Sequence, residues 1–300
     1  MSLVIVGSLA FDTIETPYGR REKIVGGSGT YCALAASFFT QPKIVGVVGE
    51  DFPEGILEFF KNKKIDIRGI EVRPGKTFYW EARYGDDPNQ RSTLRTEPNV
   101  FENFRPQLPS DYKKADIVFL ANIDPDLQDD ILVQFQNPKL VAMDTINFWI
   151  NTKPEALLQV MEKVNLYFGN EEEIRLLTEE KNLIKAGRKI LERGPFLVVI
   201  KKGEHGALVL EKDSVFGVLA HPCEEVHDPT GAGDSFAGGF LGYLDKTKAF
   251  DAEREIRRAA VYGSVLASFV IEDFGIERFK SLSPQEIERR FERFKKLVSF

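Results

Sequence analysis

The sequence predicts an α/β fold in which a mostly parallel β-sheet is covered by helices on both faces. Short, almost continuous apolar runs recur along the chain, as expected for parallel strands that are buried on both sides. Segments with helical periodicity alternate with these runs, which is the pattern of β–α–β units. The chain has 300 residues and shows no internal repeat or low-complexity linker, so we expect one large domain that spans residues 1–300.

The predicted elements can be justified in chain order. The strands are rich in β-branched and aromatic residues, and they are expected at 3–7, 43–49, 116–121, 139–144, 166–169 and 196–203. The helices are expected between them, at 28–39, 53–62, 154–163, 171–178 and 182–193. Beyond residue 230 the pattern is mostly helical, with a helix at 259–275. Near the end, Ser283, Pro284 and Glu286 form the capping-box start of a last helix.

Two stretches, 13–25 and 71–96, interrupt the α/β alternation. In the second, the segment KTFYWEAR alternates like a strand, with Phe78, Trp80 and Ala82 on one face. Because exposure of such a face is unfavourable, we expect it to cover the active site, a neighbouring subunit or the core of the same chain. We interpret both stretches as strands of a small β lid, and ordinary edge hairpins are the alternative.

Composition and charge exclude several classes of function. The net charge of −6 argues against broad binding of nucleic acid or of membrane surfaces. The two cysteines, Cys32 and Cys223, form neither a metal-ligand pattern nor a disulfide framework. No apolar run is long enough to span a membrane, and the first residues lack the basic start of a signal peptide. We therefore expect a cytoplasmic protein that acts on a small molecule.

The segment HDPTGAGDSF at 227–236 is the strongest candidate for a catalytic site. The small residues at 231–233 let another group approach the backbone closely, and the residues that follow predict the start of a helix. Free N–H groups in the first turn of a helix bind anions. Asp234 lies beside them and can accept a proton while the N–H groups hold negative charge, as phosphoryl transfer to a hydroxyl requires. The alternative is that Asp234 only caps the helix.

The segment DPTGAGDSFAGGF resembles the second signature of the ribokinase-like, or PfkB, family of carbohydrate and nucleoside kinases. Other segments resemble family motifs in the family's order, namely GSLAFD (7–12), GGSGTYCALAAS (26–37), VGEDFPEG (48–55), NEEE (170–173) and VVIKKGEHGA (198–207). The resemblance covers nearly the whole chain. It implies a three-layer ribokinase-like fold with a parallel sheet and a β lid.

The resemblance also implies a role for each matched position. Asp234 would be the catalytic base, and the amides of Gly231, Ala232 and Gly233 would form the anion hole. Asn170 and Glu173 would organise Mg²⁺ and the phosphates of ATP, mostly through water, unless they are a solvated acidic helix start. Further residues would lie along the nucleotide: Lys201, Gly203, Gly206, Ala267 and Ser268. A solvated strand end is the alternative for Lys201, and helix packing is the alternative for Ala267 and Ser268.

On the acceptor side, the resemblance places Asp12 against the hydroxyls of the substrate and lets Gly26 and Gly27 bring the substrate close to the backbone. Two asparagines that many family members carry are replaced here by Ala10 and Tyr31. Tyr31 offers an aromatic surface to the acceptor, and a buried core tyrosine is the alternative. Asn147 follows a strand and is a further candidate to face the acceptor.

These assignments predict ATP-dependent phosphorylation of a small sugar or polyol. A nucleoside kinase of the same family is the alternative, with Phe11, Tyr31 and Phe148 available to hold a base. A non-catalytic nucleotide- or sugar-binding protein is a third possibility, against which the presence of the acids and glycines argues. Asp228 and Thr230 match family positions that hold a monovalent cation such as K⁺, although Pro229 replaces a threonine there. The lid strands of several family members pair between subunits, so we expect a homodimer.

Overall fold

The main sheet of the computed structural model, which describes residues 2–299, has nine strands in the order β13-β12-β11-β10-β9-β8-β1-β4-β5. Its strands are β1 (Leu3–Val6), β4 (Lys43–Gly49), β5 (Asp66–Arg73), β8 (Ile117–Leu120), β9 (Leu140–Met143), β10 (Leu166–Asn170), β11 (Leu197–Lys201), β12 (Ala207–Leu210) and β13 (Val215–Val218). All neighbours pair in parallel except β11–β12 and β12–β13, which are antiparallel. The carboxyl ends of the parallel strands therefore meet at one edge.

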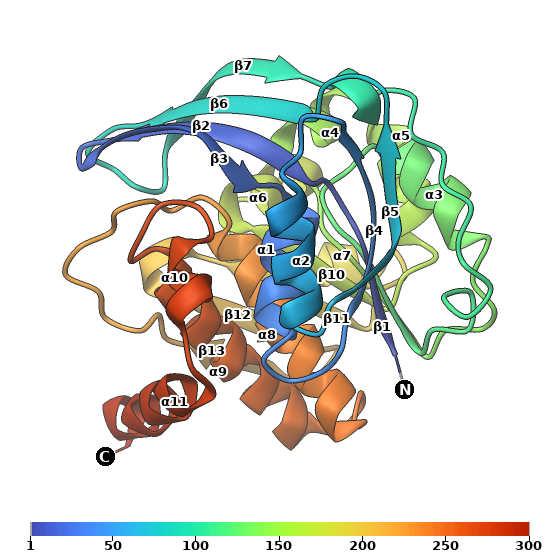
Figure 1. Cartoon of the computed structure of the whole chain (residues 1–300). Coiled ribbons are helices and arrows are strands. Elements are labelled where there is room, and N and C mark those ends of the chain that lie inside the picture. Colours follow the sequence, from blue (N-terminus) through green and yellow to red (C-terminus); the bar gives the residue numbers. More distant parts are fainter. Residues whose placement is uncertain (1, 300) are drawn as a thin grey trace.

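Helices cover both faces of this sheet and give three layers (Figure 1). Each face of the sheet packs on its own apolar core. In β1, Leu3 and Ile5 point into one core, and Val4 and Val6 belong to the other. The first cluster includes residues of α1 (Ser28–Ala36), α2 (Glu54–Asn62), α8 (Ala232–Thr247), α9 (Glu253–Val270), α10 (Glu277–Ser281) and α11 (Pro284–Val298). The second includes residues of α3 (Pro125–Leu132), α4 (Asn147–Thr152), α5 (Pro154–Met161), α6 (Glu171–Thr178) and α7 (Leu183–Leu191).

Helices α1 and α8 lie unusually close together because α8 carries glycines where they meet. A side-chain carbon at Gly238 would lie 2.2 Å from the carbonyl oxygen of Cys32. One at Gly242 would lie 2.8 Å from the Cα of Ala36. Neither position has room for a larger residue, so the backbones of the two helices are in direct contact.

A second sheet, with the order β3-β2-β6-β7, forms the lid and arches over the carboxyl edge of the main sheet (Figure 1). Its strands are β2 (Ala10–Thr16), β3 (Gly19–Gly26), β6 (Phe78–Tyr84) and β7 (Arg91–Glu97). β2 pairs with β3 in antiparallel and with β6 in parallel orientation. The strands begin earlier than the predicted 13–25, and residues 71–73 belong to β5 of the main sheet instead of to the lid.

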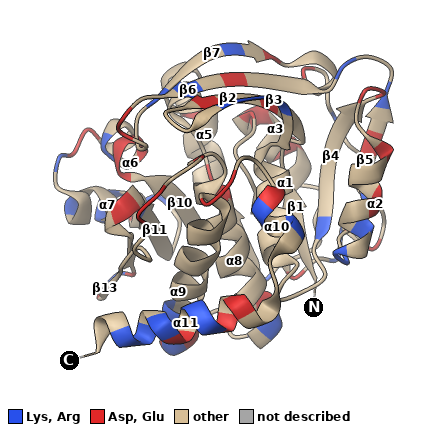
Figure 2. Cartoon of the chain, turned by 60° about the vertical axis from the view of Figure 1, so that its left-hand side comes forward, with Lys and Arg blue, Asp and Glu red and all other residues tan. Residues whose placement is uncertain are grey.

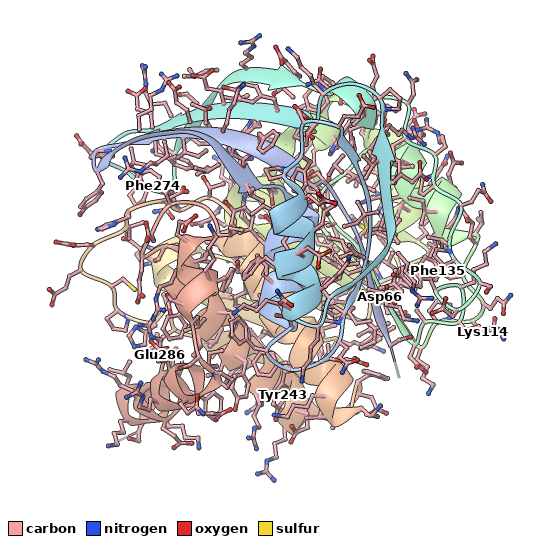
Figure 3. All side chains as sticks on the ribbon, in the orientation of Figure 1. Asp66, Lys114, Phe135, Tyr243, Phe274 and Glu286 are labelled. Carbon is pink, nitrogen blue, oxygen red and sulfur yellow. The ribbon has the colours of Figure 1, made fainter. Side chains whose placement is uncertain are left out.

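The underside of the lid packs on the same chain. Ile14, Ala82 and Tyr84 form an apolar cluster with Phe274, which Figure 3 labels below the lid. Trp80 is half-buried at the margin of this cluster. We expected the apolar lid face to cover the active site, a neighbouring subunit or the core of the same chain. These contacts show that it packs on residues of its own chain.

The predicted α/β fold is confirmed, with differences in single elements. The helix predicted at 259–275 is α9, which begins at Glu253 and ends at Val270. The start of α11 has the predicted capping box between Ser283 and Glu286. Two 3₁₀ turns, at Asn99–Phe101 and Gly203–His205, complete the described elements. Positively and negatively charged residues both occur along α11 (Figure 2).

None of the helices within residues 2–299 is both long and apolar enough to cross a membrane.

Candidate active site

The segment 227–236 forms a turn and the start of α8 at the carboxyl edge of the sheet. Gly231 is the N-cap residue and has a left-handed backbone with φ 77°, a conformation that glycine adopts without strain. Asp234 is in the first turn, and no side chain caps the helix. The expectation that Asp234 merely caps α8 is therefore not met.

The N–H groups of this turn are largely free. The N–H of Ala232 donates to the carbonyl oxygen of Pro229 at 3.3 Å, so it is partly engaged. The N–H groups of Gly231 and Gly233 make no hydrogen bond to another group among the described residues. The turn thus offers two free donors and the positive end of a helix dipole to an anion.

Asp234 is only partly accessible to solvent, and burial raises the pKa of its carboxyl group to about 6. The negative charge of Asp144 raises this pKa further, whereas the positive charges of Lys201 and Arg91 lower it. A carboxylate with a pKa near neutrality is a better general base than an exposed aspartate. The site therefore has the protonation chemistry that the predicted role of Asp234 requires.

Lys201 and Asp144 form a buried ion pair beside this turn. Lys201 Nζ lies 2.6 Å from Asp144 Oδ2, and a side-chain carbon at Gly233 would lie 3.1 Å from the same Nζ. Burial opposes the ionisation of Lys201, but the charges of Asp144 and Glu173 raise its pKa. Lys201 is therefore not a solvated strand end but a cation that reaches the helix start. Asp144 was not among the predicted site residues, although its position directly after an apolar strand was a usable signal.

Asn170 and Glu173 form the capping box of α6. Glu173 N–H donates to Asn170 Oδ1 at 2.9 Å, and Asn170 N–H donates to Glu173 Oε2 at 2.7 Å. The two residues are thus a helix start, as the alternative expected, but Glu173 is buried instead of solvated. Burial, followed by the charge of Asp144, raises the pKa of Glu173 to about 7. A cation bound near the carboxylates of Glu173 and Asp144 would relieve the repulsion between them.

Asp12 is buried, with 2% of its surface exposed, and lies against the two glycines assigned to the acceptor. A side-chain carbon at Gly26 would lie 1.8 Å from Asp12 Oδ2, so only glycine leaves room for the carboxylate. Burial raises the pKa of Asp12 well above its ordinary value, and the charges of Asp228 and Asp234 add to this effect. Gly27 has φ 96° and is the N-cap residue of α1, directly after the lid strand β3. The fold thus brings the predicted acceptor group and the predicted base together.

The other predicted acceptor residues differ in their surroundings. Tyr31 is a core residue with 1% of its surface exposed, and its ring lies against Gly231. Asn147 is the first residue of α4, and its buried Oδ1 has no partner in the described chain. Phe148 is 58% exposed and packs edge-on against Trp149, while Phe11 packs against Phe52.

The predicted nucleotide residues follow β11 and lie on α9. Gly203 and Gly206 have φ 55° and 81°, and a side-chain carbon at Gly203 would lie 1.9 Å from Asn89 Oδ1 of the lid loop. Ala267 is half-buried. Ser268 is buried, donates to Val265 O at 2.7 Å and accepts from Arg290 at 3.0 Å. For Ser268, helix packing is therefore what the contacts support.

The predicted cation residues precede the helix start. Asp228 Oδ1 accepts from Thr230 N–H at 2.9 Å, and Asp228 Oδ2 accepts from Gly275 N–H at 3.0 Å. Within residues 2–299, no group of three or more His, Cys, Asp or Glu side chains is arranged to hold a metal ion.

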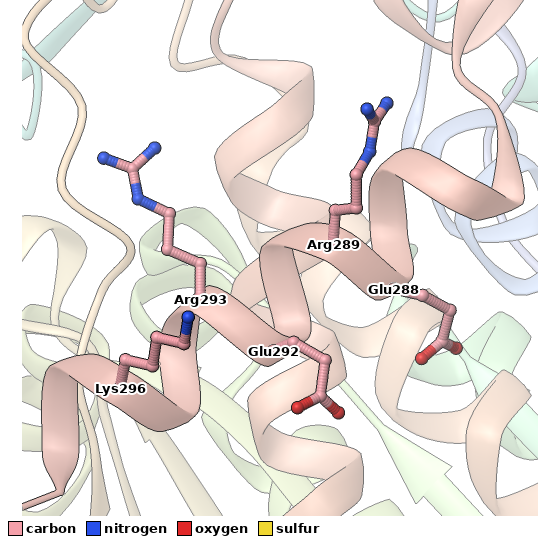
Figure 4. Close-up of a pocket in the computed structure, with 5 residues that line it drawn as sticks. All are labelled: Glu288, Arg289, Glu292, Arg293 and Lys296. Atoms are coloured by element: carbon pink, nitrogen blue, oxygen red, sulfur yellow. The ribbon is translucent and has the colours of Figure 1, made fainter.

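A hollow on α11 is lined by Glu288, Arg289, Glu292, Arg293 and Lys296 (Figure 4). It contains none of the predicted site residues.

The chain thus has a nine-stranded sheet under a β lid, with buried carboxylates and free helix N–H groups at the carboxyl edge of the sheet. The chain belongs to the PfkB family, because the family profile described as "pfkB family carbohydrate kinase" matches residues 1–280. It is similar to the cytidine kinase of Thermococcus kodakarensis, with 31% identity over 253 residues that cover 81% of this chain and 88% of the relative.

Solved structures show the same fold. A protein of E. coli described as ribokinase II, in complex with ATP and Mg²⁺, superposes with a TM-score of 0.80 and 21% identity, covering 97% of this chain and 99% of the other. The nucleoside kinase of Burkholderia thailandensis in complex with inosine superposes with a TM-score of 0.77 and 19% identity, covering 97% and 99%. These structures show the fold, and the match to the family profile makes the chain a carbohydrate or nucleoside kinase.

Proposed function

We propose that the protein transfers the γ-phosphoryl group of ATP to a hydroxyl group of a nucleoside. The observation that carries this proposal is the similarity to a cytidine kinase, with 31% identity over 81% of this chain. The buried carboxylate of Asp12, for which Gly26 leaves room, supplies a group that can hold ribose hydroxyls. A nucleoside kinase was the alternative in our sequence analysis. A free sugar or polyol, which we predicted first, is the competing acceptor.

In the proposed reaction, Asp12 accepts hydrogen bonds from two ribose hydroxyls, and Asp234 accepts the proton of the hydroxyl that attacks. The free N–H groups of Gly231 and Gly233 stabilise the charge that develops on the transferred group. Lys201, held by Asp144, adds positive charge at the same place. Mg²⁺ would enter with the ATP phosphates and lie near Asn170 and Glu173, and it would neutralise phosphate charge during transfer.

The test is phosphate transfer measured across a panel of nucleosides, sugars and polyols at equal concentration. We expect a nucleoside to give the highest kcat/KM, and ribose without a base to react at least about tenfold more slowly, because it lacks the binding energy of the base. A faster reaction with a free sugar would return the assignment to a carbohydrate kinase. ADP formation with no phosphorylated product from any compound would contradict both.

Turnover should depend on pH through Asp234. The protonated carboxyl group cannot accept a proton, and its pKa is raised to about 6 by burial and by the charge of Asp144. We therefore expect kcat/KM, which reports the pKa of the free enzyme, to fall tenfold per pH unit below about 6 and to level off above it, whereas an unperturbed aspartate would place this limb near about 4. Values of kcat/KM between pH 4.5 and 8 would show which limb is present.

Potassium should stimulate the reaction if Asp228 and Thr230 lie beside a monovalent cation, as the family pattern implies. Such a cation would add positive charge behind the helix start of α8 and so favour the anion hole. We expect a higher kcat in K⁺ than in a K⁺-free buffer that contains tetramethylammonium at the same ionic strength. Equal rates in the two buffers would remove the cation from the proposal.

We also propose a homodimer formed through the lid. The outer lid face carries charged pairs such as Arg20–Glu81 and Arg83–Glu15, so pairing there would be polar and sensitive to salt. Light scattering at micromolar concentration and at two salt concentrations is the measurement. A monomer under both conditions would contradict the dimer.

A further inference from the structure

A hydrogen bond joins Tyr84 of the lid to the turn before α8. Tyr84 is the last residue of β6, and Thr230 immediately precedes the N-cap glycine of α8. Thr230 Oγ1 donates a hydrogen bond to the Tyr84 hydroxyl at 3.2 Å, across 146 positions of sequence. This bond links a lid side chain directly to the turn whose N–H groups are assigned to the transferred phosphoryl group.

Both ends of this hydrogen bond are held in place. Tyr84 is 7% exposed and packs with Ile14, Ala82 and Phe274 under the lid. The backbone N–H of Thr230 donates to Asp228 Oδ1, so the residue is oriented from two sides. Because both side chains are buried, their hydrogen bond ties the lid to the turn.

The turn is supported on its other side by the core. A side-chain carbon at Gly231 would lie 2.4–2.5 Å from three ring carbons of Tyr31, so the ring of this buried tyrosine lies directly against the glycine. Tyr31 belongs to α1, which packs on α8. The Thr230–Gly231 turn thus lies between the buried ring of Tyr31 and the hydroxyl group of Tyr84 in the lid.

A second pair of contacts anchors the same part of the lid. Thr16 Oγ1, at the end of β2, donates to the carbonyl oxygen of His227 at 2.8 Å. The ring of Tyr18 stacks on the ring of His227, with the centroids 4.6 Å apart. These contacts place the lid on segment 227–230, so a lid that opened would break the Tyr84–Thr230 bond as well.

We propose that Tyr84 is a positioning residue that completes the anion hole only when the lid is closed. In the closed state it holds Thr230, and through it the N–H of Gly231, in the geometry that stabilises the transferred phosphoryl group. With the lid open the turn loses this support, so that ATP bound without an acceptor would be hydrolysed slowly. This inference rests on the proposed role of Gly231 and Gly233.

The test is Tyr84→Phe, which removes the hydroxyl and keeps the ring in its apolar cluster. We expect kcat to fall about tenfold, the effect of one hydrogen bond of ordinary strength, with KM for ATP unchanged. Tyr79→Phe is the matched control, because Tyr79 lies on the same strand and donates to Glu81 on the outer lid face. It should leave kcat as in the wild type. Both variants should melt within a few degrees of the wild type.

A double-mutant cycle with Thr230→Val separates positioning from a general loss of lid packing. If the two groups act through their hydrogen bond, Tyr84→Phe should have little further effect in the Thr230→Val background. An equal fall in kcat for Tyr84→Phe in both backgrounds, or none in either, would overturn the proposal.

Binding of Mg·ADP with aluminium fluoride, which mimics the transferred phosphoryl group, keeps this inference distinct from the proposed function. We expect Tyr84→Phe to weaken binding of this complex, measured with cytidine present, and to leave Mg·ADP binding unchanged. Equal binding by both proteins would refute the role of Tyr84 even if the enzyme is a nucleoside kinase. If no nucleoside is phosphorylated, the nucleoside assignment fails, and the same measurement with the best acceptor of the panel still decides the role of Tyr84.

Discussion

Replacement of Asp234 by asparagine is expected to lower kcat by about 10²–10⁴-fold, the usual contribution of a general base. Asparagine has nearly the same shape as aspartate but cannot accept the proton of the acceptor hydroxyl. The binding of MgATP should change little, because the free N–H groups of the helix start remain. Steady-state kinetics with the best acceptor and calorimetric titration with MgATP would measure both effects.

Asp245→Asn is the matched control for this prediction. Asp245 is a second buried carboxylate of α8, distant from the carboxyl edge, and it is hydrogen-bonded by Thr40. Its replacement should lower the melting temperature and leave kcat of the folded enzyme near that of the wild type. If Asp234→Asn turns over at a rate close to the wild type, another group must accept the proton.

Gly231→Ala is expected to abolish most activity and to destabilise the protein. Alanine at φ 77° costs about 1–2 kcal/mol, and its side chain would lie 2.4 Å from the Tyr31 ring. Relief of this contact must move either the turn or α1, and a displaced turn no longer presents its N–H groups. Loss of one such donor lowers kcat by about 10²–10³-fold.

Gly55→Ala provides the comparison, because this glycine lies in α2 and an added side-chain carbon would meet nothing within 4 Å. Removal of a helical glycine should raise the free energy of unfolding by up to about 1 kcal/mol with activity unchanged. Thermal unfolding and kcat of the two variants give the readout. Wild-type kcat in Gly231→Ala would show that the turn does not form the anion hole.

The strands of the main sheet could be predicted because burial on both faces demands apolar runs such as Lys43–Gly49. The edge strand Asp66–Arg73 was missed because one side of it has no neighbour, and its sequence DIRGIEVR mixes charged and apolar residues. Helix Pro125–Leu132 was also missed, since PDLQDDIL has few apolar residues. Its capping residue Asp124 followed by Pro125 was the available signal.

Part of the candidate site could be predicted because its residues are adjacent in the chain, and the rest depends on contacts between distant segments. The residues from Gly231 to Asp234 are adjacent in the chain, so a single motif identifies them. The ion pair of Asp144 with Lys201 joins the residue after β9 to the last residue of β11, 57 positions further along the chain. The contact of Tyr84 with Thr230 joins the lid to the core. No local pattern encodes such contacts, and only the folded chain reveals them.

The direct backbone contact of α1 with α8 has a mechanical consequence. Gly238 and Gly242 leave no layer of side chains in which the two helices could slide, although glycine within a helix costs about 1 kcal/mol per residue. Helix α1 begins directly after the acceptor glycines, and α8 begins at the anion hole. The starts of α1 and α8 therefore belong to one rigid body, and the separation between Gly27, at the start of α1, and Asp234 is determined when the chain folds instead of when the substrate binds.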